Sequence, residues 1–252
     1  MIFYEYISRL QAILERIKQE QAEAIRQAGL LAAEAISRGG VIHAFGTGHS
    51  HIIAEEPFFR AGGIAAINPI LDERLIFLKG ALESTRAERE SGLAESLIER
   101  ENVQETDVSI IVSNSGRNAV PVEMALGMKR RGVRVIAITN LEQSRAVASR
   151  HKSGKKLYEL ADVVIDNCVP TGDALVSIKG LNSKTGASST VAGAAIVHSI
   201  VIETLNELLR RGERALVLPS ANVEGTTADI LRCVLRRYQS RIRYLDLETE
   251  ID

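Results

Sequence analysis

Aromatic residues are scarce in this sequence. They make up 4% of its 252 residues, and tryptophan is absent. Platforms that stack nucleic-acid bases depend on aromatic rings, and so do the flat shelves on which some proteins hold sugars. The composition therefore argues against both, and any sugar would have to be recognised through polar groups.

An excess of charge of either sign is also absent. Lysine plus arginine number 31 and aspartate plus glutamate number 32, which leaves a formal net charge of −1. A chain so balanced has no strong field that would attract a phosphate backbone or an acidic membrane. We predict no nucleic-acid partner and no membrane partner.

Cysteine is nearly absent too. Cys168 and Cys233 lie far apart and in no metal-ligand spacing, which is typical of a reducing compartment where thiols stay free. The stretch from Met1 to Arg16 carries a charge every few positions and lacks the apolar core of a signal peptide. We expect a cytoplasmic protein.

The sequence does contain a regular alternation of apolar runs. From Tyr4 to Ser37 apolar residues recur at three- and four-residue steps, which predicts one long helix or two. Strands and helices then alternate, and because such an order requires crossover connections, the sheet should be parallel and covered on both faces. The expected strands are 41–45, 64–70, 107–113, 133–139 and 163–166, and the expected helices are 50–61, 119–131, 143–150 and 188–211, with a charged helical insert over 72–106. This predicts the α/β class, as a three-layer, doubly wound parallel sheet with a helical N-terminal segment.

Length and composition fit one domain over residues 1–252, because 45% of the residues are hydrophobic. We divide it into an N-terminal helical segment (1–39), a core (40–211) and a C-terminal tail (212–252). The tail contains a polar turn at Pro219–Asn222 and a last amphipathic stretch at Thr227–Arg243.

Two polar loops each follow an expected strand and open an expected helix. The first consists of Gly46, Thr47, Gly48, His49 and Ser50, and the second of Ser113, Asn114, Ser115, Gly116, Arg117 and Asn118. Glycines permit close backbone approach, and hydroxyls, amides and helix N-termini can surround an anion without a buried lysine. Such residues are also what any strand-to-helix turn prefers. Their joint position at the carboxyl ends of two parallel strands favours a shared phosphate or sugar site.

With their strands, the two loops resemble the two signatures of the sugar isomerase (SIS) domain of phosphosugar-binding proteins, over about Gly40 to Leu209. The resemblance implies a flavodoxin-like fold and a phosphate held by the second loop, through Ser113, Asn114, Ser115 and Asn118. It also implies a homodimer or homotetramer, because SIS domains pair through their helices. A dinucleotide site is a weaker alternative, since the first loop lacks the third glycine of that motif. We expect no metal and no cofactor, because no histidine and carboxylate cluster has metal-ligand spacing.

Interconversion of an aldose phosphate and a ketose phosphate needs a base and an acid. Glu55 and Glu56 follow the first loop, and His198 lies in an apolar late helix, at a spacing from Thr190 similar to that of phosphoheptose isomerases. The position of that family's catalytic glutamate is occupied here by Arg60. Glutamates at a helix start are also common as dipole partners, and a histidine in an apolar helix is often a core residue.

The same segments resemble N-acetylmuramic acid 6-phosphate etherases, which use two glutamates. Glu56-Pro57 is similar to their Glu-Cys-Pro, and the segment Ser84–Glu90 makes Glu88 or Glu90 a possible second glutamate. The alternative for the charged insert is a solvated helix. Three functions therefore follow from the sequence: a sugar-phosphate isomerase, a lyase or etherase of an amino-sugar phosphate, and a non-catalytic phosphosugar sensor.

Overall fold

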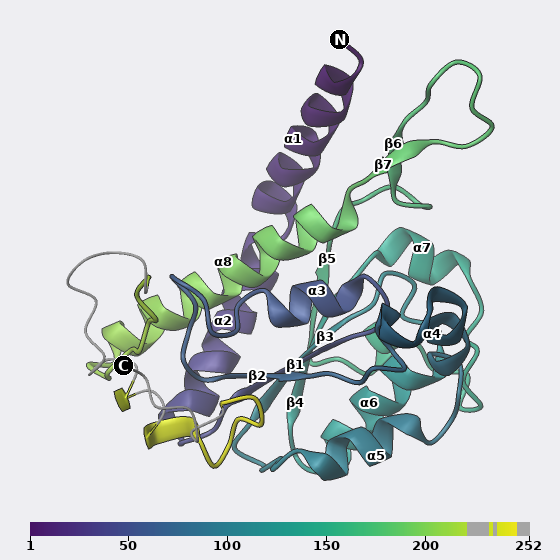
Figure 1. Cartoon of the computed structure of the whole chain (residues 1–252). Coiled ribbons are helices and arrows are strands. Elements are labelled where there is room, and N and C mark those ends of the chain that lie inside the picture. Colours follow the sequence, from purple (N-terminus) through teal and green to yellow (C-terminus); the bar gives the residue numbers. More distant parts are fainter. Residues whose placement is uncertain (221–231, 234–235, 246–252) are drawn as a thin grey trace.

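A five-stranded parallel sheet forms the centre of the molecule, in the order β2-β1-β3-β4-β5 (Figure 1). Its strands are β1 (Ile42–Gly46), β2 (Ile67–Ile70), β3 (Val108–Val112), β4 (Arg134–Thr139) and β5 (Val163–Asp166). This is the flavodoxin-like order, in which the chain turns back at β1 and β3. The computed structural model describes residues 1–220, 232–233 and 236–245.

Helices cover both faces of the sheet, which confirms the predicted three-layer α/β fold. One apolar cluster joins one face to α2 (Ala22–Ser37), α3 (Ser50–Glu55) and α8 (Ser189–Arg210), and the other joins the opposite face to α4 (Ala81–Ala87), α5 (Leu93–Arg100) and α6 (Ala119–Arg130). Because side chains alternate along a strand, Ile110 and Val112 belong to the first cluster and Ile111 to the second.

The N-terminal segment forms two helices, α1 (Phe3–Glu20) and α2, which Gln21 separates. In α1 only Ile13 and Ile17 are buried, and its first half projects from the body beside a hairpin of β6 (Ala174–Val176) and β7 (Thr185–Ala187) (Figure 1). The hydroxyl of Tyr6 donates to the carbonyl of Ala187 over 2.8 Å. The hairpin was not predicted, because each of its strands has only three residues.

Helix α8 is the one helix in the described part of the chain that is long and apolar enough, by length and composition alone, to cross a membrane. Its buried side instead packs into the protein core. Gly193 leaves room for Ile53 of α3, and Gly29 of α2 lies against Glu203. A side chain at either glycine would collide with its neighbour, so the helices can approach closely only with glycine there.

Three local expectations were wrong. The helix expected over 50–61 ends at Glu55, because Pro57 cannot continue the backbone hydrogen bonding. The second strand begins at Ile67, and Ile64 instead forms an antiparallel bridge with Val217. The insert is helical, as predicted, but α5 is not a solvated helix, because its apolar side is buried in the second cluster.

Two further expectations concern α7 and the tail. α7 spans Leu141–Ala146, which is shorter than the predicted 143–150 at its C-terminal end. In the tail, Ala221 and Asn222 of the expected turn and residues 227–231 and 234–235 of the expected amphipathic stretch lie outside the described residues.

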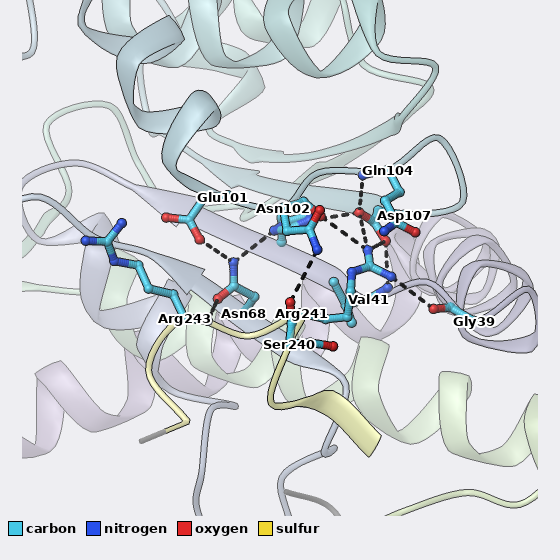
Figure 2. Close-up of polar contacts among 11 residues, drawn as sticks. Gly39, Val41, Asn68, Glu101, Asn102, Gln104, Asp107, Ser240, Arg241 and Arg243 are labelled. Carbon is cyan, nitrogen blue, oxygen red and sulfur yellow. Dashed lines mark hydrogen bonds and ion pairs between the residues drawn. The ribbon is translucent and has the colours of Figure 1, made fainter. Parts of the chain in front are cut away.

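Asp107 is the centre of a buried polar network at the amino-terminal edge of the sheet (Figure 2). Its carboxylate accepts hydrogen bonds from the backbone N–H groups of Val41 (2.9 Å) and Gln104 (2.7 Å). It also accepts one from Nε2 of His43 (3.0 Å) and pairs with the guanidinium of Arg241 at 2.7 Å. A residue of the C-terminal tail thus neutralises a carboxylate between β1 and β3.

Asn68 of β2 extends this network. Its side-chain amide donates to Nδ1 of His43 (3.0 Å) and to Glu101 (2.9 Å), and its Oδ1 accepts the backbone N–H of Arg243 (3.1 Å). The two ring nitrogens of His43 thus face Asn68 and Asp107. The row of hydrogen bonds ties the tail to three strands.

Stability should decrease at acidic pH because of Asp107. Burial raises the pKa of this carboxyl, but the hydrogen bonds from His43 and from the backbone of Gln104 and Val41 outweigh burial and hold the pKa below its ordinary value. A lowered pKa stabilises the folded state fully above the unfolded pKa of about 3.9, and this contribution is lost as the pH falls through the folded value. Urea unfolding between neutral pH and pH 3 should show that loss in the wild type and a smaller one in Asp107→Asn. Equal losses would contradict this assignment.

Candidate functional site

The two predicted loops meet in one pocket of about 370 Å³ at the carboxyl ends of β1 and β3. This is the point where the strand order reverses, at which open α/β sheets bind their ligands. The lining residues from the two loops are Thr47, Gly48, His49, Ser50, Ser113, Asn114, Ser115 and Asn118. Six further lining residues come from elsewhere, namely Glu88, Gln143, Asp173, Ala187, Ser189 and Thr190.

Glycine shapes the first loop. A side chain at Gly46 would collide with the backbone of Ser50, so the chain can turn tightly into α3 only with glycine there. Gly48 has a φ of +52°, and its N–H donates to the carbonyl of Leu75 over 2.8 Å. These contacts hold the backbone of the loop against the segment that follows β2.

The second loop is fixed partly by its own side chains. The hydroxyl of Ser113 accepts the N–H of Gly116 (3.2 Å), and Oδ1 of Asn114 accepts a hydrogen bond from Asn167 (2.6 Å). Gly116 does not line the pocket but has a φ of +55° and packs on Leu157. In the described part of the chain the hydroxyl of Ser115 has no hydrogen-bond partner, so it is free for a ligand.

Glu88 brings a carboxylate into the pocket from the charged insert. Its Oε1 accepts the hydroxyl of Thr47 over 2.9 Å. Its backbone carbonyl accepts the N–H of Val120 over 3.1 Å, which fixes the residue beside the start of α6. Sequence reasoning named Glu88 only as an alternative to Glu90, and the structure places Glu88 in the pocket lining.

Asp173 also lines the pocket, and sequence reasoning missed it. It accepts the backbone N–H groups of Ser188 (2.9 Å) and Ser189 (2.6 Å) and the hydroxyl of Ser189 (2.7 Å). Burial raises its pKa, but the bonds from Ser189 and Ser188 outweigh burial and hold the pKa below its ordinary value. An ionised Asp173 therefore holds the start of α8 at the pocket. Gly172-Asp173 is a sequence typical of any turn, so it does not distinguish a site residue.

The predicted acid and base residues lie elsewhere in this chain. Oε1 of Glu56 lies 3.2 Å from Nε2 of His198, and Glu56 also pairs with Arg60. Glu55 lies 3.8 Å from Nε2 of His51. None of these side chains lines the pocket. The structure thus brings Glu56 and His198 together, outside the lining of the pocket formed by the two loops.

The described residues contain no group of three or more histidine, cysteine, aspartate or glutamate side chains that could hold a metal ion. The donors in the pocket are hydroxyls, amides, backbone N–H groups and the imidazole of His49, and the acceptors include the carboxylates of Glu88 and Asp173. This set suits a polar anionic ligand with hydroxyl groups, because N–H and O–H donors bind anions and carboxylates accept from hydroxyls.

Residues 5–140 match the family model of the SIS domain, which is more than half of the chain. The chain belongs to the SIS domain family. A UPF0309 protein of Halalkalibacterium halodurans is 43% identical over 223 residues, which cover 88% of this chain and 92% of that relative. These findings confirm the resemblance that the two loops indicated.

Solved structures show the same fold. A phosphoheptose isomerase from Francisella tularensis superposes with a TM-score of 0.51 at 16% identity, over 80% of this chain and 95% of that one. A phosphoheptose isomerase from Neisseria gonorrhoeae gives a TM-score of 0.50 at 14% identity, over 78% of this chain and 92% of that one. The SIS match ends at Asn140, so Gln143, Asp173 and the residues at the start of α8 complete the pocket from outside the matched segment.

Proposed function

We propose that this SIS domain binds a phosphorylated sugar in the pocket. The phosphate contacts Ser113, Ser115 and Asn118 after the end of β3, where two hydroxyls and a side-chain amide can donate to its oxygens. The sugar hydroxyls extend toward Gly48 and Ser50. Support comes from the convergence of both loops on one pocket and from the free hydroxyl of Ser115.

Replacing Ser115 with alanine should weaken binding of the phosphorylated sugar by about ten- to a hundredfold, because a hydrogen bond to a charged group contributes about 1.5–3 kcal/mol. The melting temperature without ligand should be unchanged, since this hydroxyl has no partner within the described residues. Titration calorimetry measures the affinity. Ser149→Ala, whose hydroxyl bonds to Lys155 outside the pocket, serves as the control. Unchanged affinity in Ser115→Ala would remove the phosphate from this loop.

The reaction that we propose is an aldose–ketose isomerisation with Glu88 as the general base. The observation that carries it is the position of this carboxylate in the same pocket as Ser115. Glu88 removes the proton from C2 of the aldose while His49, which also lines the pocket, donates a proton to the carbonyl oxygen at C1, which gives an enediol. His49 then takes the proton of the C2 hydroxyl as Glu88 returns its proton to C1, which completes the ketose and restores both side chains. Exchange of the C2 proton with solvent, observed by proton NMR in D2O, tests this step.

An elimination is the second candidate, because Glu88 lies in the segment that resembles the etherases. It begins with the same proton removal, but a leaving group departs from C3 instead of a proton arriving at C1. Analysis of the products distinguishes the two reactions. Binding without exchange would indicate a phosphosugar sensor.

We further propose a homodimer. Large apolar side chains are exposed on the first half of α1, on the hairpin and on the outer side of α8, namely Ile2, Phe3, Tyr4, Ile7, Leu181, Val191, Ile202 and Leu209. Burial of such surface between subunits is favourable. The Glu56–His198 pair is partly exposed, just after α3 and on α8, and lies outside the pocket lining of its own chain, so we propose that it reaches the partner's pocket.

The change Ile202→Asp should convert this dimer to a monomer, because it places a charge on the paired surface. The side chain of Ile202 is 62% exposed, so the subunit itself should stay folded. Sedimentation velocity measures the mass. Leu82→Asp, on the opposite side of the sheet, should leave the dimer intact, and a monomeric wild type would contradict the proposal.

A further inference from the structure

Three arginine residues from separate segments meet beside Asn118 at the start of α6. The backbone N–H of Arg150 donates to the carbonyl of Arg117 over 2.8 Å, and its Nη1 donates to Oδ1 of Asn118 over 3.0 Å. Arg89 directly follows Glu88, which the backbone of Val120 holds at the same place. We call Arg89, Arg117 and Arg150 the arginine cluster.

No member of the arginine cluster has an ion-pair partner among residues 1–220, 232–233 and 236–245. Nε of Arg117 is buried and has no hydrogen-bond partner. Other arginines of the same layer are neutralised, since Arg130 and Arg131 share Glu95.

The members of the cluster also repel one another. The pKa of Arg150, an exposed residue, is lowered by slight desolvation and by the positive charges of Arg117 and Arg89, and Glu88 opposes them. The carboxylate of Glu88 already accepts the hydroxyl of Thr47. Gathering like charges beside a desolvated donor costs free energy. An anion bound there would remove that cost.

The arginine cluster does not line the pocket. Asn118 lies between the two, because it lines the pocket and accepts the bond from Arg150. A phosphate held by Ser113, Ser115 and Asn118 takes its hydrogen bonds from the pocket side. The guanidinium groups of the arginine cluster therefore remain free to bind a different anionic group.

We infer that the arginine cluster binds a second anionic group of the ligand, on the far side of Asn118 from the phosphate. This inference rests on the proposed function and narrows its substrate class to sugar phosphates with a further carboxylate or phosphoryl group. Guanidinium groups suit both, because their planar N–H donors bind two oxygens at once.

The test is titration calorimetry at fixed ionic strength with three probes: glucose 6-phosphate, 6-phosphogluconate and glucose 1,6-bisphosphate. The wild type should bind one of the two doubly acidic probes at least tenfold more tightly than glucose 6-phosphate. A preference for 6-phosphogluconate identifies a carboxylate, and a preference for glucose 1,6-bisphosphate identifies a phosphoryl group. In Arg117→Gln/Arg150→Gln the tenfold gain should disappear, while the affinity for glucose 6-phosphate stays within about twofold.

Arg38→Gln/Arg134→Gln is the matched control, because it removes the same charge at the opposite edge of the sheet. Arg89→Gln, which leaves both bonds of Arg150 in place, should lose part of the gain and serves if the double variant does not fold. Equal affinities for all three probes in the wild type would overturn the inference and leave the phosphate loop in place. Equal weakening of all three in the arginine variants would also overturn it, since the cluster would then serve the single phosphate. No binding of any probe would contradict the proposed function and the inference together.

Discussion

Replacing Glu88 with glutamine removes turnover of the sugar phosphate and leaves its binding in place. Glutamine keeps the shape of the side chain, and its amide oxygen can still accept the hydroxyl of Thr47, as Oε1 of Glu88 does at 2.9 Å. It cannot take a proton from C2. A positioned general base contributes about 10²–10⁴-fold to the rate, so kcat should fall by that factor. The dissociation constant should change by no more than a few fold.

The variant Glu56→Gln is the informative comparison. Glu56 pairs with Arg60 and His198 outside the pocket lining of its own chain. If the partner subunit's pocket uses this pair, Glu56→Gln lowers turnover in the dimer. Adding Glu56→Gln to the monomeric Ile202→Asp variant then causes no further loss of turnover. Exchange of the C2 proton, followed by NMR in D2O, measures both variants. Full exchange in Glu88→Gln together with none in Glu56→Gln would contradict the assignment of Glu88.

Removing the carboxylate of Asp107 lowers the free energy of unfolding by about 3–5 kcal/mol, the cost of breaking a buried ion pair from one side. The Asp107→Ala change leaves the guanidinium of Arg241, whose side chain is only 11% exposed, without the carboxylate that neutralises it. It also leaves Nε2 of His43 and two backbone N–H groups without an acceptor. Urea unfolding followed by circular dichroism measures the loss.

A double-mutant cycle shows whether the pair with Arg241 accounts for this loss. Arg241→Met should cost less than Asp107→Ala, because His43 and the backbone still bond to the carboxylate. The double variant should be more stable than the sum of the single losses predicts, since removing both charges leaves none unpaired. Strictly additive losses would show that the tail does not depend on this pair.

The fold was predictable because the strands that form the sheet are short apolar runs followed by glycine or polar turns. Each of the five expected strands overlaps an observed one, and 163–166 matches β5 at both ends. The hairpin β6–β7 was not predictable, because three-residue strands leave no periodic pattern. It is instead fixed by tertiary contacts, such as the bond from Tyr6 to Ala187.

The two loops of the candidate site were predictable for a different reason. They follow adjacent parallel strands, whose carboxyl ends must meet at one edge of the sheet. Glu88 and Asp173 depend on packing that the sequence does not reveal. Glu88 is fixed by the backbone of Val120, and Asp173 is fixed by Ser188 and Ser189 at the start of α8. The proximity of Glu56 and His198, 142 positions apart, likewise depends on how α3 packs against α8.

Binding of a phosphorylated sugar in the pocket is the central claim, and a thermal-shift measurement tests it most directly. The wild type and Ser115→Ala are melted with a panel of sugar phosphates, each paired with its unphosphorylated sugar, because a ligand bound only by the folded state raises the melting temperature. We predict that at least one sugar phosphate stabilises the wild type, that its parent sugar does not, and that Ser115→Ala loses the response. Equal stabilisation by a sugar phosphate and its parent sugar, or an undiminished response in Ser115→Ala, would contradict a phosphate site in the second loop.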